Sequence, residues 1–421
     1  EMQRSLVGSE MCIRDRFIQE ALPWLDYLKI RASHGSVGND RITDVRFPYL
    51  TKVNEGTGSA WGVPDIEIIG ETRIGADNLA WEKAIKSNVG IEGKLFNNKI
   101  DFVVDIFHDQ RNGIFQQRVQ VPEFVGVVSN PYANVGKMKS YGADGNISFT
   151  QDFTPDFGFT LRGNFTYSKN KVQNWEQAYL EYPYLEYNNF PYNSIRGYQA
   201  VGLFKDEDDI KYSPKQTFGE VMPGDIKYKD LNGDGKIDED DRTRVGRGNR
   251  PELTYGLNLN CAWNGFDLSA QFTGGALFDV SLTGTYYNGY DDNTVWTQAF
   301  KEGANSPLYL VQNAYTTENP NGTFPRLTLG NQGHGGDNGL ASTFWLRNGR
   351  YLRLKSAQLG YTFPKKWMSP VGIQNLRIYV EGSNLFTISG LPDGIDPESP
   401  GVNNGYYPQQ RTIMGGITLT F

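Results

Sequence analysis

The segment Ile417-Thr418-Leu419-Thr420-Phe421 alternates strictly between apolar and polar residues and ends on an aromatic ring. A period of two places successive side chains on opposite faces of a β-strand. In a water-soluble sandwich the apolar faces of such strands pack together, whereas in a membrane barrel they meet lipid and the polar faces line the lumen. The terminal aromatic residue favours the barrel.

About ten segments with this alternation run through the chain, and most are joined in pairs by short turns. They cover residues 28–36, 88–95, 100–110, 142–151, 157–168, 253–263, 266–273, 351–363, 376–384 and 412–421. Asn264-Gly265, between two of them, is the strongest hairpin signal in the chain. Leu352 and Leu354 fall out of phase with Leu359, and this predicts a β-bulge.

Long connections alternate with these short turns. They cover residues 39–86, 111–141, 169–252, 274–350 and 385–411. Bacterial outer-membrane barrels have short periplasmic turns and long external loops, and their strands need roughly 9–11 residues to cross the bilayer. The sequence therefore predicts an all-β, antiparallel transmembrane β-barrel in the outer membrane, with a periplasmic C-terminus and extracellular long loops.

The composition agrees with a barrel and argues against several other classes. The 421 residues include 13% aromatic residues and 48 glycines. No run of eighteen apolar residues occurs, which excludes a transmembrane helix. A formal net charge of −7 without basic patches argues against nucleic-acid binding. The two cysteines, Cys12 and Cys261, are too few for a disulfide framework.

Residues 1–16 show neither the helical nor the strand period and resemble a translated adapter sequence, so we expect them to be non-native. A charged loop or short helix is the alternative. No apolar region of a signal peptide opens the chain. Residues 17–421 are predicted to form one partial barrel domain, the C-terminal part of a larger barrel, because the first strand would otherwise leave an open edge in lipid.

One local motif carries specific chemistry. Residues 230–241 read D-x-N-x-D-G-x-I-D-x-x-D, the pattern of a calcium-binding loop. Its metal ligands are expected at Asp230, Asn232, Asp234, the backbone carbonyl of Lys236, Asp238 and Asp241. Gly235 permits the sharp turn, Ile237 anchors the loop, and Asp241 replaces the usual glutamate, as in dockerin-like loops. The alternative is an acidic turn held by Asx hydrogen bonds without a metal.

Aromatic residues gather in the long connections. We expect contacts with substrate or partner from Tyr182, Tyr184, Tyr187, Tyr286, Tyr287, Tyr290, Trp296, Tyr406 and Tyr407. Aromatic rings stack on sugar faces and enrich protein interfaces, although packing within a large ordered loop explains them equally well. No nucleophile elbow, phosphate-binding loop or zinc motif occurs, so no catalytic residue is predicted.

Several stretches are typical of one family. They are residues 24–33, 81–83, 224–235, 344–355 and 381–386, which read WLDYLKIRAS, WEK, GDIKYKDLNGDG, FWLRNGRYLRLK and EGSNLF. From about residue 17 onward, the chain resembles the C-terminal portion of a SusC/RagA-type TonB-linked outer-membrane transporter.

The resemblance implies a 22-stranded barrel with an N-terminal plug domain, energised through the TonB complex, and a SusD-like surface lipoprotein as partner. It implies active import of oligosaccharides or, less often, peptides, and no enzymatic activity. Neither a plug nor a TonB box is recognisable in these residues, so transport is expected of the intact parent protein. Two alternatives stay open. One is an exported multi-domain β-sandwich that binds or cleaves glycans and has a dockerin-like calcium loop, and the other is a passive porin.

Overall fold

The computed structural model describes most of the chain. The described residues are 9–12, 22–44, 47–60, 63–76, 78–121, 130–282, 308–327, 336–393, 395–399 and 409–421. Among them, no helix is both long enough and apolar enough to span a membrane.

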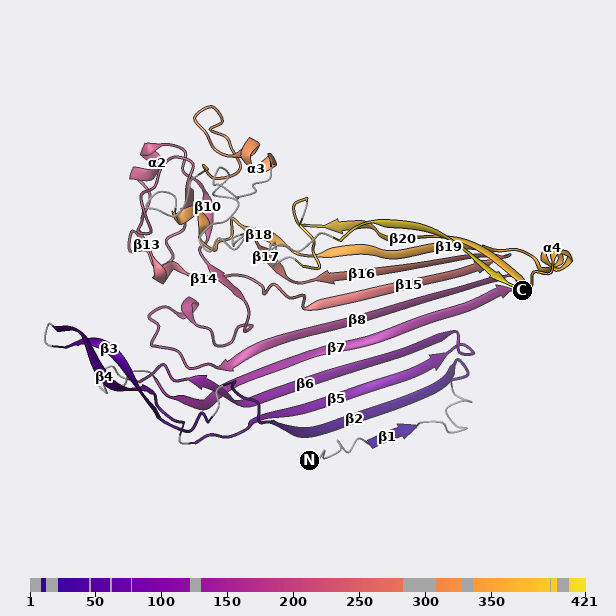
Figure 1. Cartoon of the computed structure of the whole chain (residues 1–421), viewed down its shortest axis with the longest axis horizontal. Coiled ribbons are helices and arrows are strands. Elements are labelled where there is room, and N and C mark those ends of the chain that lie inside the picture. The colour runs from indigo at the N-terminus through magenta and orange to yellow at the C-terminus, as the bar shows by residue number, and fades with distance from the viewer. Residues whose placement is uncertain are drawn as a thin grey trace.

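One large antiparallel sheet dominates the structure (Figure 1). Its strands follow one another in the order β1-β2-β5-β6-β7-β8-β15-β16-β19-β20-β21. Their bounds are β1 (Ser9–Cys12), β2 (Leu25–Asn39), β5 (Glu82–Leu95), β6 (Ile100–Gln117), β7 (Tyr132–Thr154), β8 (Phe157–Asn174), β15 (Leu253–Trp263), β16 (Phe266–Ala276), β19 (Tyr351–Thr362), β20 (Asn375–Ser389) and β21 (Thr412–Thr420). All ten predicted strands are present, which confirms the prediction of an all-β, antiparallel fold.

Short connections lie together at the end of the sheet beside the C-terminus (Figure 1). Asn264 and Gly265 join β15 to β16 with φ angles of 48° and 88°, the two positive values that a type I′ turn requires. Residues 155–156 join β7 to β8, and residues 96–99 join β5 to β6. The β19–β20 connection, residues 363–374, is longer because it contains two short helical turns.

The long connections lie at the opposite end, as the sequence predicts (Figure 1). Outside the large sheet, the short elements are β3 (Lys52–Ala60), β4 (Val63–Arg73), η2 (Pro183–Leu185), β9 (Ile195–Gly197), β10 (Ala200–Leu203), α2 (Glu207–Lys211), β11 (Lys215–Gln216), β12 (Ile226–Tyr228), β13 (Lys236–Ile237), η3 (Glu239–Asp241), β14 (Thr243–Gly246), β17 (Asp279–Ser281), α3 (Leu308–Asn313), η4 (Gly336–Gly339), β18 (Leu346–Asn348), α4 (Lys365–Met368) and η5 (Ser369–Val371). All but α4 and η5 belong to the long connections.

The central strands are longer than predicted. β6 and β8 have 18 residues each and β7 has 23, about twice the roughly 9–11 residues that cross a bilayer. The additional residues lie at the long-loop end, for example 132–141 in β7 and 169–174 in β8. Hydropathy does not alternate there, so the sequence pattern ends before the strand does.

The predicted bulge is present at Lys355. Gln271 on β16 pairs with Ser356, and the next residue, Phe272, pairs with Leu354. Lys355 is therefore the extra residue, and it shifts the phase of the apolar side chains along β19.

β1 differs from the sequence prediction. It lies within residues 1–16, which we expected to be non-native and outside the fold, yet it pairs antiparallel with β2. A sheet edge exposes N–H and C=O groups that a nearby extended segment can pair with, whatever its origin. The non-native origin of residues 1–16 stays a prediction.

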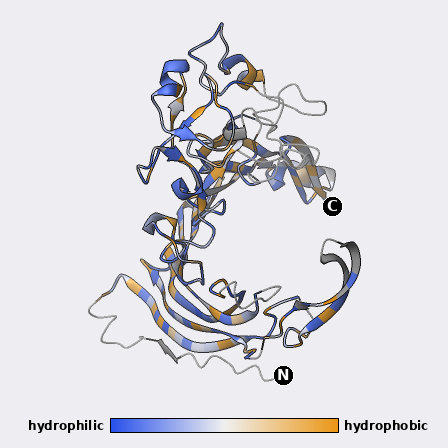
Figure 2. Ribbon diagram, turned by 90° about the vertical axis from the view of Figure 1, so that its left-hand side faces the viewer, coloured by the Kyte–Doolittle hydropathy of each residue, from blue (hydrophilic) through white to orange (hydrophobic). Residues whose placement is uncertain are grey.

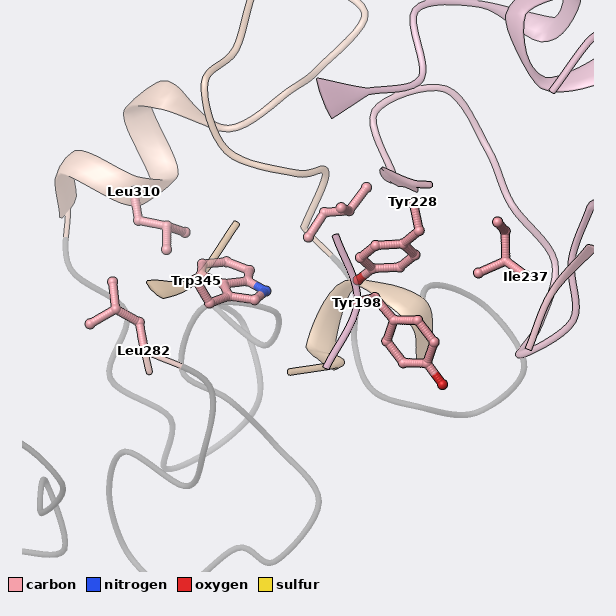
Figure 3. Close-up of a cluster of buried hydrophobic side chains, with 7 residues drawn as sticks. Tyr198, Tyr228, Ile237, Leu282, Leu310 and Trp345 are labelled. Atoms are coloured by element: carbon pink, nitrogen blue, oxygen red, sulfur yellow. The ribbon is translucent and has the colours of Figure 1, made fainter. Parts of the chain in front are cut away.

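The long connections have a hydrophobic core of their own (Figure 3). Its buried members are Tyr198, Ile226, Tyr228, Ile237, Leu282, Leu310 and Trp345. These residues come from the two longest connections, so the two pack together as one loop layer at the end of the sheet (Figure 1).

Candidate functional site

The large sheet is bent into an arc (Figure 2), and its two faces differ in polarity. One face carries large apolar side chains that stay exposed, and Ile106, Ile413 and Ile417 are 63%, 70% and 66% exposed. Among the described residues, the other sheets have two strands each, and none of them is large enough to cover this face. An apolar face of this extent fits lipid, and the soluble sandwich is not supported.

Aromatic rings gather at the short-turn end of the sheet. The ring pairs are Trp24–Phe96, Phe153–Phe157, Trp263–Phe266, Phe266–Tyr361 and Tyr361–Phe363, with centroids 4.6–6.5 Å apart. Such rings are typical of the aromatic girdle where a barrel meets the membrane interface. The sequence analysis did not identify this girdle, because most of these rings meet across neighbouring strands and hairpins.

The opposite face is polar, and several of its charges are paired across strands. Arg31 on β2 forms ion pairs with Glu92 on β5 and Asp105 on β6. Arg377 on β20 donates from Nε to Asp267 on β16 at 3.0 Å. A recess on this face is lined in part by Asp144, Asn146, Arg162, Asn164, Asn258 and Gln271. This wall of amides and charged groups can line a passage for a polar solute.

A buried carboxylate holds the loop layer together. Asp225 is fully buried, and its Oδ1 lies 2.6 Å from Nε of Arg326 and accepts a hydrogen bond from Nδ2 of Asn338 at 2.7 Å. Its Oδ2 accepts from the backbone N–H of Met222 at 2.8 Å. The indole N–H of Trp345 donates to the carbonyl of Asn338 at 2.6 Å, which ties this polar network to the hydrophobic core.

Sequence reasoning missed this network. In the sequence, Asp225 stands out only as part of the family-like stretch 224–235, and its side-chain partners lie about a hundred positions away along the chain. The one available signal is that Asp225 follows a glycine and precedes an apolar strand, and this does not reveal a partner.

The last long connection is anchored to the polar face. Arg353 on β19 is buried, and its guanidinium lies 2.7 Å from Asp396 and 2.8 Å from Glu398. Glu398 also accepts from Nζ of Lys355 at 2.9 Å. The bulged lysine thus acts with Arg353 to hold residues 395–399 on the sheet.

The acidic loop 230–241 is closed by its own hydrogen bonds. Asp230 accepts from the backbone N–H groups of Gly233 and Gly235 at 2.6 and 2.9 Å. Asn232 accepts from the N–H of Asp234 at 3.1 Å, and Asp234 accepts from that of Lys236 at 2.8 Å. These are the local bonds of consecutive Asx turns.

Asp241 and Ile237 fix the ends of this loop. Asp241 is fully buried and accepts from the N–H groups of Leu231 and Asp238 at 2.7 and 3.0 Å. Ile237 is fully buried in the core of the loop layer, where the sequence analysis placed the anchor. Among the described residues, no three His, Cys, Asp or Glu side chains are gathered closely enough to hold a metal ion.

Two of the predicted tyrosines lie against the acidic loop. Tyr182 and Tyr184 stack with ring centroids 5.4 Å apart and an angle of 10°. The Tyr182 hydroxyl lies near the side chain of Asn232. Burial, with Asp241 nearby, raises the pKa of Tyr184 to about 12, so its hydroxyl stays protonated at physiological pH. The structure thus brings together two groups of residues that the sequence analysis treated separately.

The remaining seven predicted contact residues are not shown to contact the acidic loop. Tyr187 is half-exposed, and the guanidinium of Arg196 lies 4.4 Å from its ring centroid. The other six lie outside the described residues, namely Tyr286, Tyr287, Tyr290, Trp296, Tyr406 and Tyr407.

Comparison with known proteins finds relatives that are named TonB-dependent receptors, although no family model matches the chain. TonB-dependent receptor P3 of Formosa agariphila is 25% identical over 93% of this chain and 39% of its own length. TonB-dependent receptor SusC of Bacteroides thetaiotaomicron is 24% identical over 94% of this chain and 38% of its own length. The chain spans about two fifths of the length of these relatives. They are receptors rather than enzymes, as the sequence predicts for this chain.

Solved structures agree. The RagAB peptide importer in its open-open state matches with a TM-score of 0.70 and 25% identity, over 98% of this chain and 42% of that chain. The RagAB peptide transporter matches with a TM-score of 0.68 and 24% identity, over 98% of this chain and 43% of that chain. Fold and sequence likeness thus confirm that the chain is similar over nearly its whole length to SusC/RagA-type TonB-dependent transporters.

Proposed function

We propose that this chain supplies strands of an outer-membrane barrel that imports an oligomeric nutrient. The observation that carries the proposal is the ten-strand antiparallel arrangement with an exposed apolar face, tight turns at one end and all long connections at the other. Outer-membrane barrels place long loops outside the cell, so the loop layer would be extracellular and the C-terminus periplasmic.

Import would be active and would need partners. The relatives named above are TonB-dependent receptors, and two solved structures of the same fold belong to RagAB, whose name joins two components. By analogy, we propose energy input through the TonB complex and a SusD-like lipoprotein that covers the loop layer. A passive porin stays the alternative, and loss of uptake on deleting the TonB gene would exclude it.

The proposed substrate is an oligosaccharide, with a peptide as the second candidate. The parallel stack of Tyr182 and Tyr184 favours a sugar, because aromatic rings stack on sugar faces. The peptide is favoured by the matching structures, which are a peptide importer and a peptide transporter. Tyr182→Ala should lower oligosaccharide affinity about 2–10-fold, the effect of about 0.5–1.5 kcal/mol of ring stacking. Tyr212→Ala, on an exposed ring of the same connection, is the control.

We also propose that loop 230–241 binds Ca²⁺ as a structural ion. Asp230, Asn232, Asp234, Asp238 and the carbonyl of Lys236 would hold it, since hard cations prefer oxygen ligands. Asp241 would close the loop, because both of its oxygens accept backbone N–H groups. A bound ion would draw these oxygens together and offset the repulsion among the carboxylates of the loop.

Calorimetry of calcium binding to the full-length protein tests this ion site. Wild type should release heat that Asp234→Ala abolishes, while Asp208→Ala, an acidic residue of the same connection outside the loop, should leave it unchanged. Equal heats from wild type and Asp234→Ala would remove the calcium proposal.

Membrane insertion is tested separately. The full-length protein should appear in outer-membrane fractions and migrate faster in gels before heating than after, as folded barrels do. A soluble protein whose migration does not change on heating would refute the import proposal.

A further inference from the structure

A row of lysines lies on the apolar side of the sheet, directly beyond the apolar band. On β8, every second residue from Phe157 to Tyr167 faces this side, and the same series continues with Lys169 and Lys171. On β7 the series reaches Tyr141 and continues with Lys139 and Lys137. Both strands lie side by side and extend toward the loop layer (Figure 1).

The register places like charges directly opposite one another. Lys139 on β7 pairs with Lys171 on β8, and Lys169 pairs with Tyr141. Opposite side chains on paired strands have Cβ atoms about 4.5–5.5 Å apart, and like charges there destabilise a sheet. A cross-strand lysine pair therefore needs an anion to offset its repulsion.

No protein anion supplies this charge in the part of the chain that the structure describes. None of Lys137, Lys139, Lys169 and Lys171 has an ion pair or hydrogen-bond partner there. Their neighbours on the next strand, β6, are uncharged amides, since Gln110 pairs with Lys139 and Asn112 with Lys137. Lys83 on β5, which pairs with Asn112, adds another positive charge to the row.

The level of this row along the strands identifies the anion. From Phe157 to Tyr167 the strand rises about 33 Å, which at a tilt of about 40° spans about 25 Å of membrane, the height of an apolar band. Tyr141 and Tyr167 then lie where tyrosines of barrels meet the interface, and the lysines lie at headgroup level. Lysines there extend along apolar surface toward phosphates.

We propose that Lys137, Lys139, Lys169 and Lys171 form a binding site for the phosphates of a lipid headgroup in the leaflet on the long-loop side. The site rests on the proposed membrane location. A phosphate carries up to two negative charges and three acceptor oxygens, so it can bridge the Lys139–Lys171 pair, and further phosphates can bind the flanking lysines.

The test uses the full-length protein in a neutral detergent, titrated with diphosphorylated lipid A and followed by native mass spectrometry and thermal unfolding. Lys139→Gln/Lys171→Gln should bind this lipid about 25-fold more weakly than wild type, since each lysine near an anionic lipid is worth about 1 kcal/mol. Lipid should raise the unfolding temperature of wild type and leave that of the double variant nearly unchanged. Lys86→Gln/Lys94→Gln, with the same charge loss on the polar face of β5, should behave as wild type.

Three results would overturn the lysine site. They are unchanged lipid affinity of the Lys139→Gln/Lys171→Gln variant, equal binding of dephosphorylated lipid A, and saturation by inorganic phosphate alone. Outer-membrane fractionation and heat-modified migration of the same preparations test the membrane barrel independently of the lysine site. A barrel that passes both and still fails the lipid titration contradicts the lysine site alone.

Discussion

Replacing Asp225 with asparagine should destabilise the loop layer and leave the sheet intact. The substitution keeps the shape of the side chain but removes the charge that faces Arg326, and it sets an amide against the amide of Asn338. Removing one partner of a buried ion pair costs about 3–5 kcal/mol. The Arg326 side chain keeps 19% exposure and can be partly hydrated, so we expect about 3 kcal/mol, the lower end of that range.

Hydrogen–deuterium exchange of the full-length protein in detergent measures this effect region by region. A loss of about 3 kcal/mol predicts about 100-fold faster exchange for peptides that cover β12 and residues 338–345. Peptides from β15 and β16 should exchange as in wild type. The matched control is Glu239→Gln, which removes the same charge from an exposed pair with Arg242 and should cost less than about 1 kcal/mol.

A double variant distinguishes two costs: the loss of the Asp225–Arg326 ion pair, and the burial of the Arg326 guanidinium without a partner. In Asp225→Asn/Arg326→Met no buried guanidinium is left unpaired, so the protection of the loop layer should return in part. Exchange of Asp225→Asn at the rate of Glu239→Gln, or a joint loss of protection in the sheet and the loop layer, would contradict this role of Asp225.

Three other experiments test separate parts of the structure. Arg353→Gln should release residues 395–399 to proteases by removing the buried partner of Asp396 and Glu398, while Lys355→Gln, with a more exposed side chain, should have a smaller effect. Gly265→Val should cost about 1–3 kcal/mol and lower the yield of heat-modifiable barrel, because φ is 88° and a Cβ there would lie 2.8 Å from the Thr362 carbonyl. For Tyr184, the folded pKa of about 12 lies above the usual value of about 10, so its contribution to stability is complete below pH ~10 and is lost as pH rises through the folded pKa. The loop layer of wild type should therefore lose stability in that alkaline window, as seen by fluorescence and tyrosinate absorbance, and Tyr184→Phe should lose less.

The ten long strands could be predicted from the sequence because one face of each meets lipid. That contact forces an apolar residue at every second position, and the pattern is visible wherever the strand is at membrane depth. In β7 the predicted strand, 142–151, covers the apolar band, while residues 132–141 project beyond it and carry lysines and amides. Water on both sides imposes no alternation, so the loop-side ends were missed.

The loop layer was not predictable in the same way. Ile226, Leu310 and Trp345 pack in one core but lie on separate short segments, each with no period of its own. The acidic motif was recognisable because its spacing is local, and the burial of Ile237 followed from it. The contact of Tyr182 and Tyr184 with that loop depends on how the residues between Tyr184 and the loop fold, and no local sequence pattern predicts that.

The sheet and the loop layer are therefore stabilised by different physical means. In lipid the strands cannot lose their hydrogen bonds cheaply, because no water replaces them, so the sheet resists local opening. The loop layer lies in water. It is stabilised by a small hydrophobic core, by the buried ion pair of Asp225 and Arg326, and by the backbone hydrogen bonds that Asp241 accepts. Its stability can change without disturbing the barrel wall, and this is the property that a surface needs if it binds substrate, a lid or a cation while the wall stays closed to lipid. The lysine row lies at the boundary between the two parts, where lipid phosphates would fix how far the strands project from the membrane.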